Sequence, residues 1–163
     1  MRESQRVEFE WMFRSTYPSV LRTTYLVLHD LGRAEEITQD AFLKLYERWR
    51  GVVRIDHPQA WVRRVAVRAA IKQARSSRLR PWVDRTDEPA IDDRLPDIDL
   101  ARAVATLAPQ QRAAVALYYL EDLSVDEVAH LLDVSSSTVK QHLHRARARL
   151  AELLTEEVSR DVD

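Results

Sequence analysis

Cations suited to binding phosphate gather in the last third of the chain, where residues 134–151 contain no acidic side chain. They are Lys140, Arg145, Arg147 and Arg149. Apolar residues recur between them at intervals of three and four, the spacing of the buried face of a helix: Val139, Leu143, Ala146 and Leu150. Lys and Arg on the other face of such a helix bind phosphate and read base edges in a major groove. The pattern therefore predicts a DNA-binding helix.

A second, shorter helix is expected just before it. Ser124 is a good N-cap, and Glu127 three residues later completes a capping box. The apolar face would consist of Val125, Val128, Ala129 and Leu132. A turn at Asp133-Val134 precedes three serines, residues 135–137, any of which could cap the basic helix. A solvated basic helix is the alternative, but the capped helix and short turn favour a helix-turn-helix.

The formal net charge of −1 hides a segregation of charge along the chain. Residues 61–80 carry seven cations and no acid, whereas residues 84–99 carry seven acids and two cations. Such blocks indicate separate partners for separate segments, or an acidic segment that shields basic ones.

The fold class expected is all-α. The chain has only two glycines and few alternating runs, which argues against a sheet. Pro81, Pro89 and Pro96 interrupt the acidic block, so residues 81–97 are expected to be a linker. We predict a helical domain at residues 5–80 and a second, with the helix-turn-helix, at residues 98–157.

The first domain is expected to hold helices near residues 9–28, 33–49 and 59–75. Pro18 either kinks the first helix or starts another. Phe42 lies off the apolar stripe of the second helix and is either a flanking core residue or an exposed partner anchor. The third helix is expected to bury Val62, Val65, Ala66, Ala69 and Ala70 and to project Arg63, Arg64, Arg68 and Lys72 outward. Trp61 lies among these arginines, where it either caps the core or stacks on unpaired bases.

Several classes are disfavoured by composition. The absence of cysteine excludes disulfides and Cys-ligated zinc, and no two of the five histidines have the i, i+4 spacing of a helical metal site. No nucleophile lies beside a recognisable base, so we expect no enzyme, no catalytic residue, no metal and no cofactor. No apolar run approaches the roughly 20 residues of a membrane span, so we expect a cytoplasmic protein without membrane insertion.

The order of several motifs resembles the extracytoplasmic-function group of bacterial RNA polymerase sigma factors, the sigma-70 family. The motifs that resemble the promoter-binding domain are residues 107–112 (LAPQQR), Leu123-Ser124 with Glu127 and Ala129, and residues 138–150. Residues 34–43 (AEEITQDAFL) resemble the polymerase-binding helix, and residues 58–62 (PQAWV) resemble the start of the helix that reads the −10 element. The resemblance covers nearly the whole chain except the linker and the last residues.

The resemblance implies a role for each matching residue. The −35 element would be read by Ser137, Thr138, Lys140, Gln141, His144, Arg145 and Arg147. The opened −10 element would be engaged by Trp61, Arg63, Arg64, Arg68 and Lys72. The β′ coiled coil of core RNA polymerase would dock on Glu36, Gln39, Asp40 and Phe42, and an anti-sigma factor is implied as a further partner. The protein would bind core polymerase and direct promoter recognition, DNA melting and transcription initiation.

The chain also departs from the family pattern. Arg68 stands where Asn is frequent, Lys72 where an acid is frequent, His142 where Arg is frequent, and Asp133 where Gly is frequent. We further hypothesise that acids of the linker, among them Asp92, Asp93 and Asp97, partly mask the basic helices in the free protein. The alternative function is a helix-turn-helix transcriptional regulator with an N-terminal effector or dimerisation domain. This alternative does not explain the basic helix that contains Trp61.

Overall fold

The computed structural model describes residues 1–50, 55–76 and 96–161, and in these residues all regular structure is helical. The elements are α1 (Glu3–Leu28), α2 (Leu31–Arg50), α3 (Pro58–Ser76), α4 (Ile98–Ala105), α5 (Pro109–Val115), the π-helix η2 (Ala116–Leu120), α6 (Val125–Leu132) and α7 (Ser136–Asp161). The all-α prediction is confirmed. Most of the expected linker, residues 81–95, lies outside the described residues, so its masking role stays a hypothesis. None of the described helices is long and apolar enough to span a membrane.

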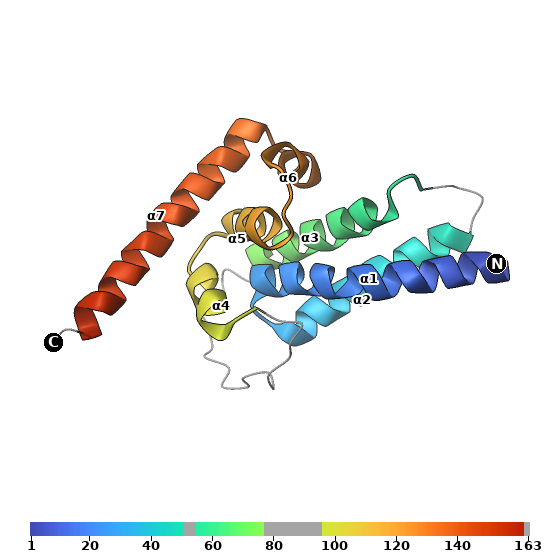
Figure 1. Ribbon diagram of the computed structural model, residues 1–163, viewed down its shortest axis with the longest axis horizontal. Helices are drawn as coiled ribbons and strands as arrows, with labels where there is room; N and C mark the ends of the chain where they lie inside the picture. The colour runs from blue at the N-terminus through green and yellow to red at the C-terminus, as the bar shows by residue number, and fades with distance from the viewer. Residues whose placement is uncertain (51–54, 77–95, 162–163) are drawn as a thin grey trace.

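The first three helices form a bundle in which α1 packs against both α2 and α3 (Figure 1). Pro18 lies inside α1, which continues through it as a single helix, so it does not start a second one. Neighbouring hydroxyls bond to main-chain oxygens in this stretch: Ser15 donates to Met12 at 3.0 Å and Ser19 donates to Thr16 at 3.1 Å. α1 thus stays helical through Pro18, which supplies no N–H to the helical ladder.

Aromatic rings join α1 to α2 in this bundle. The ring of Phe42 lies 5.0 Å from that of Phe13 and 5.6 Å from that of Tyr17. Trp49, at the end of α2, donates its indole N–H to the carbonyl oxygen of Gln5 at 3.2 Å. Edge-to-face ring pairs and a satisfied indole stabilise a core beyond the area they bury.

The turn between α1 and α2 is tight because His29 adopts the left-handed conformation, with φ 55. The two helices then lie close enough for the buried hydroxyls of Thr24 and Thr38 to hydrogen-bond at 3.0 Å. Asp30 accepts from the main-chain N–H of Arg33 at 3.1 Å, which satisfies one of the free donors at the start of α2.

The second half of the chain packs against the first. In Figure 1, α5 lies between α7 and the bundle, and it contacts α1, α3 and α7. A single apolar core therefore runs through both halves; it includes Leu21, Leu26 and Val67 from the first and Val104, Leu117 and Val128 from the second. α7 extends away from the bundle and carries the C-terminal end of the chain (Figure 1).

Candidate nucleic-acid interface

The helix-turn-helix is built by local capping. Ser124 accepts from the N–H of Glu127 at 3.1 Å, and the Glu127 carboxylate accepts from the N–H of Ser124 at 2.7 Å, so the capping box is confirmed. α6 ends at Asp133, whose backbone is left-handed, with φ 57 and ψ 48. Of the three serines that could cap α7, Ser135 does so, because its hydroxyl accepts from the N–H of Thr138 at 3.1 Å. The turn thus forms without the glycine that the family pattern favours.

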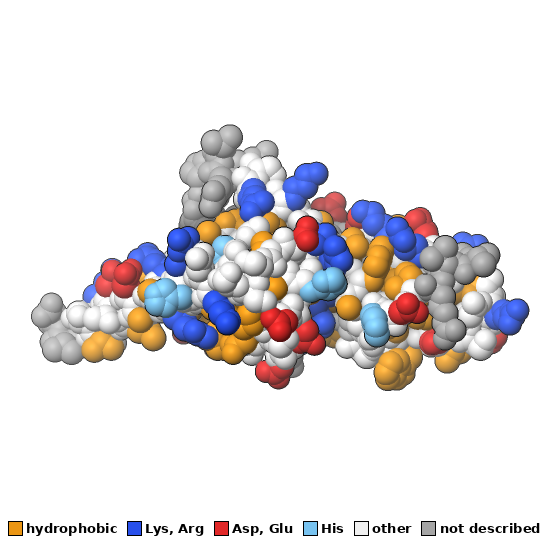
Figure 2. Space-filling view, turned by 90° about the horizontal axis from the view of Figure 1, so that it is seen from above, with side chains coloured by type: hydrophobic (Ala, Val, Ile, Leu, Met, Phe, Trp, Pro, Cys, Tyr) orange, Lys and Arg blue, Asp and Glu red, His pale blue; other side chains and the backbone are white. Residues whose placement is uncertain are grey.

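The N-terminal half of α7 presents two different faces. Val139, Leu143 and Ala146 are buried and Leu150 is half-buried, which confirms the predicted inner face. Most of the residues predicted to face DNA are exposed: Ser137, Lys140, Gln141, His144, Arg145 and Arg147, with Thr138 partly buried beside the cap. Figure 2 shows cationic side chains (blue) and histidine (pale blue) along the part of the molecule where α7 lies.

Two side chains of α7 are tied to its neighbours. Arg147 donates to the hydroxyl of Tyr119 in η2, and its guanidinium lies 5.6 Å from the centre of that ring. The imidazole Nε2 of His142 lies 3.0 Å from the side-chain oxygen of Gln110 in α5. Burial, and secondly the charge of Arg145, lower the pKa of His142 below its ordinary value. His142 is therefore a packing residue on the α5 side of the helix rather than part of the exposed cationic face.

In α3 the residues predicted to engage the −10 element are in unequal surroundings. Lys72 is exposed, whereas Trp61 and Arg64 are half-buried. The Trp61 ring packs beside the core of the bundle and also carries the guanidinium of Arg48, 5.0 Å from its centre. The ring is thus a core cap with a cation over one side, which confirms the first interpretation of Trp61, while stacking on unpaired bases stays a prediction. Arg48 escaped the sequence analysis because it comes from the preceding helix.

Arg63 and Arg68 point into the junction with the second half of the chain. Arg68 donates from Nε to the carbonyl oxygen of Leu131, near the end of α6, at 3.1 Å. Arg63 donates to the hydroxyl of Ser19 at 3.2 Å and pairs with the carboxylate of Glu121 at 3.7 Å. The expectation that both project outward from α3 is wrong for this arrangement, because α5 and α6 pack against α3 and the two arginines reach Leu131 and Glu121.

Glu121 is the centre of that junction and was not singled out by any local pattern. Its side chain is 6% exposed and also lies 3.8 Å from Arg22 of α1. Burial raises the pKa of Glu121 above its ordinary value, against the opposing effects of Arg63 and Arg22. The left-handed residue Asp122, with φ 52, turns the chain out of η2 immediately after it.

The predicted docking face on α2 is exposed for three of its four residues, Glu36, Gln39 and Asp40. Phe42 is 3% exposed and packs in the aromatic core, so the exposed-anchor interpretation is wrong and the flanking-core one is confirmed. Its position off the main stripe is explained by α1, whose rings Phe13 and Tyr17 cover that side of α2. Leu43, which the sequence analysis passed over, is 56% exposed on this helix.

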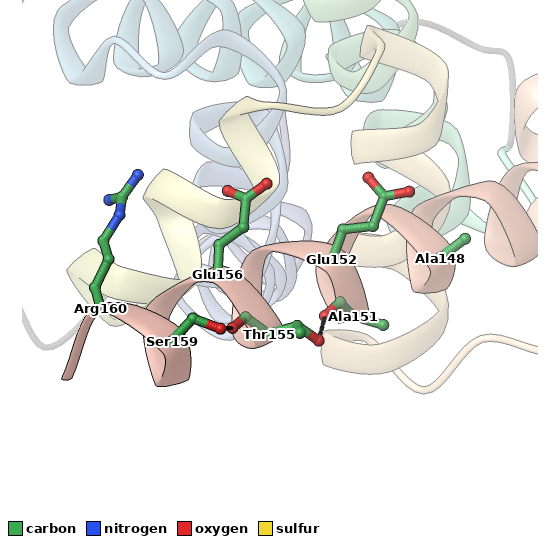
Figure 3. Close-up of a pocket in the computed structure, with 7 residues that line it drawn as sticks. All are labelled: Ala148, Ala151, Glu152, Thr155, Glu156, Ser159 and Arg160. Carbon is green, nitrogen blue, oxygen red and sulfur yellow. Dashed lines mark hydrogen bonds between the residues drawn. The ribbon is translucent and has the colours of Figure 1, made fainter. Parts of the chain in front are cut away.

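A surface hollow near the end of α7 offers no chemistry of its own (Figure 3). The hydroxyls of Thr155 and Ser159 are used in bonds of 2.9 Å to the helix's own carbonyl oxygens. Among the described residues, no group of three or more His, Asp or Glu side chains is arranged to hold a metal ion.

A capped helix-turn-helix with a cationic outer face, packed on a helical bundle with a second row of cations, defines a DNA-binding protein of the helical class. Comparison with known families identifies which one. The family described as Sigma-70 region 2 matches residues 12–80, and Sigma-70, region 4 matches residues 97–150. The chain belongs to the sigma-70 family of RNA polymerase sigma factors, and as a sigma factor it directs transcription initiation. Sigma factors are regulators rather than enzymes.

Individual relatives agree with this assignment. An RNA polymerase sigma-E factor of Streptomyces antibioticus is 33% identical over 176 residues, covering 100% of this chain and 92% of the relative. An ECF RNA polymerase sigma factor, SigM, of Mycobacterium tuberculosis is 32% identical over 154 residues, covering 91% and 78%. The fold is similar to that of the Bartonella quintana sigma factor RpoE solved in complex with the anti-sigma factor NepR, with a TM-score of 0.69 and 20% identity over 91% of this chain and 97% of that one.

Proposed function

We propose that the two halves of this sigma factor contact different parts of a promoter. Residues 98–157 would read the −35 element through the outer face of α7. Residues 5–80 would engage the opened −10 element through α3 and bind core polymerase through α2. The observation that supports the first assignment most directly is the exposure of Lys140, Gln141, His144 and Arg145 on a helix whose opposite face is buried.

For the −10 element the proposal uses Trp61, Arg63, Arg64, Arg68 and Lys72. An aromatic ring among cations suits a melted strand, because bases stack on the ring while cations follow the phosphates. Residues 51–54 of the loop before α3 lie outside the described residues. Neither half alone should bind tightly, but tethering makes the second contact intramolecular, and core polymerase would set the separation.

Core polymerase would dock on the exposed face of α2, where Glu36, Gln39 and Asp40 lie with Leu43 beside them. Acidic side chains around an exposed apolar residue suit a basic, amphipathic helical partner. Leu43 takes the place that the sequence analysis gave to the buried Phe42. The protein would work in the cytoplasm, where a bacterium keeps its DNA and polymerase.

An anti-sigma factor is a further proposed partner. A groove lined almost entirely by apolar side chains runs between α4, η2 and α7, and its lining includes Leu100, Tyr119, Leu120 and Leu154. Each of these four is among the large hydrophobic residues with exposed surface. Exposed apolar surface of this kind is typical of protein-binding sites.

The proposal is tested by in vitro transcription with purified bacterial core polymerase on a pool of random promoters. Arg145→Ala should weaken recognition of the upstream element and leave polymerase association intact. Gln39→Ala with Asp40→Ala should reduce association with polymerase and leave binding to duplex DNA intact. Failure of the wild-type chain to confer site-selective initiation would overturn the proposal and favour a regulator that acts without core polymerase.

A further inference from the structure

The junction between the two halves uses arginines reciprocally. Arg112 of α5 donates to the carbonyl oxygen of Val27, near the end of α1, at 2.7 Å. Arg68 of α3 donates to the carbonyl oxygen of Leu131, near the end of α6, at 3.1 Å. The last carbonyls of a helix lack partners within it and carry partial negative charge, so a guanidinium is well matched to them. Each half thus supplies a cation to a helix end of the other.

A third contact is a carboxylate enclosed by cations. Glu121 lies 3.7 Å from Arg63 and 3.8 Å from Arg22, with Ser19 also hydrogen-bonded in this cluster. A guanidinium group binds a carboxylate with a geometry similar to that with which it binds a phosphate. Glu121 therefore occupies, for Arg63, the place of an anionic ligand.

From this geometry we propose that the free chain is closed on itself, and that Glu121 and α6 occlude the arginines with which α3 would bind DNA. The inference rests on the proposed function of α3. Its consequence is an asymmetry between the two DNA-binding surfaces. The outer face of α7 stays open in the closed chain, while Arg63 and Arg68 become available only after the halves separate.

Glu121 itself does not hold the closed form together once its carboxyl group is ionised. A buried carboxylate must lose its water, and burial is the main reason that the pKa of Glu121 is raised despite Arg63 and Arg22. Asp122, beside it, raises the pKa further. Because the raised pKa belongs to the closed form, the ionised carboxylate favours the open form, in which it is hydrated. Closure therefore depends on the shared apolar core, while Glu121 aligns the junction and neutralises Arg63.

Closure can be tested on the wild-type chain by arginine-specific labelling with phenylglyoxal followed by mass spectrometry. Arg63 and Arg68 should react at least about tenfold more slowly than the exposed residues Arg75 and Arg145, because their guanidinium groups lie in the junction. Equal rates at all four arginines would overturn the proposal. This readout needs neither DNA nor polymerase, so it is independent of the proposed promoter contacts.

Occlusion can be tested with substitutions of Glu121 and a fluorescent single strand of twenty thymidines at low salt. Glu121→Arg places a third cation beside Arg22 and Arg63 and should open the chain, raising affinity for the strand by roughly tenfold. Glu121→Gln removes the charge but keeps the shape, so it should not raise affinity. Glu10→Arg, on the exposed surface of α1, makes the same change in net charge and should give a much smaller gain.

Two further measurements decide the cause of any gain. Adding Arg63→Ala to Glu121→Arg should abolish the gain, because Arg63 is the residue released. The chain has no cysteine, so labels at Glu47→Cys and Glu156→Cys report the distance between α2 and α7. The distribution of this distance should be narrow and centred at a short value without the Glu121 substitution, and broad in Glu121→Arg. The proposal is overturned if Glu121→Gln raises affinity for the strand as much as Glu121→Arg does. It is also overturned if the gain in affinity of Glu121→Arg persists when Arg63→Ala is added, because the gain would then be an effect of net charge alone. If circular dichroism shows that Glu121→Arg has lost its helices, the phenylglyoxal labelling of the wild-type chain still tests whether the chain is closed.

Discussion

Phe42 and Leu43 are neighbours in α2 whose side chains meet different surroundings, one in the aromatic core and one in solvent. Leu43→Ala is expected to weaken association with core polymerase by about 1–2 kcal/mol, since a leucine buried in an interface contributes about that much. The free energy of unfolding of Leu43→Ala should differ from that of the wild type by less than about 0.5 kcal/mol. Fluorescence anisotropy with core polymerase and urea unfolding measure the two effects.

Phe42→Ala is the matched control, because it removes the ring that contacts Phe13 and Tyr17. It should lower the free energy of unfolding by about 3–5 kcal/mol. Polymerase association at a temperature where the variant is folded should be close to normal. A strong loss of association in folded Phe42→Ala, with none in Leu43→Ala, would restore Phe42 as the docking residue.

His142 gives the fold a pH dependence. Because burial and Arg145 lower its pKa in the folded chain, the folded form favours the neutral ring, and stability is lost as pH falls below the unfolded value of about 6.5. His29, whose pKa is lowered by burial and then by Arg112 and Arg102, acts in the same direction. The raised pKa of Glu121 acts in the opposite direction, with a contribution that is complete below the unfolded pKa of that carboxyl and lost as pH rises.

His142→Gln should therefore make the decline in unfolding free energy between pH 7 and pH 5 shallower without removing it, since His29 remains. Gln can still hydrogen-bond to Gln110, so the two proteins are compared at pH 8 to separate the packing effect. Urea unfolding at each pH provides the measurement. Parallel curves for the two proteins would show that His142 is not the titrating group.

At the scale of elements, the end of α6 carries avoidable strain. Asp133 has φ 57 and ψ 48, a region where a residue with a Cβ costs about 1–2 kcal/mol more than in the right-handed helix. Asp133→Gly should raise the free energy of unfolding by about 0.5–1 kcal/mol, and Asp133→Ala should lower it, because Asp tolerates this backbone better than Ala does. Chemical unfolding of the two variants should bracket the wild type. If both variants are destabilised, a side-chain contact of Asp133 and not its backbone is what matters.

The sequence predicts these elements well because their signals are local. The expected helix at residues 59–75 agrees with α3 (Pro58–Ser76), and a capping box at Ser124 marked the start of α6. The sequence could not predict which residues of α3 are buried. The expected inner face included Ala69, which is exposed, and omitted Val67 and Ile71, which are buried because α5 and α6 pack on a second side of the helix.

The same reason explains the error at the candidate site. Periodicity identifies Arg63 and Arg68 as polar positions, and a helix alone would expose them to solvent. Their partners, Glu121 and the carbonyl oxygen of Leu131, lie far along the chain and belong to no motif that involves α3. The exposed face of α7 was predictable because α5 and α6 pack against the inner face of this helix and leave its outer face uncovered.

At the scale of the whole molecule, the core shared by the two halves determines how the chain unfolds. Leu26 and Val67 lie in one apolar cluster with Leu117 and Val128, so the halves stabilise each other. A tethered pair of independent domains would unfold in two steps, whereas halves that share a core unfold together. The wild-type chain is therefore expected to show one thermal transition, with equal calorimetric and van't Hoff enthalpies.

Arg112 adds polar contacts to that coupling. It donates to the carbonyl oxygens of Val27, Leu107 and Ala105 at 2.7, 2.8 and 3.1 Å, and so joins the end of α1 to the turn between α4 and α5. Lysine keeps the charge but cannot span three acceptors in one plane. Arg112→Lys should lower stability by about 2–4 kcal/mol and split the transition, the second half unfolding first. Differential scanning calorimetry decides, with Arg149→Lys, on the exposed surface of α7 in the second half, as the matched control. A single, uniformly shifted transition in Arg112→Lys would mean that apolar packing alone couples the halves.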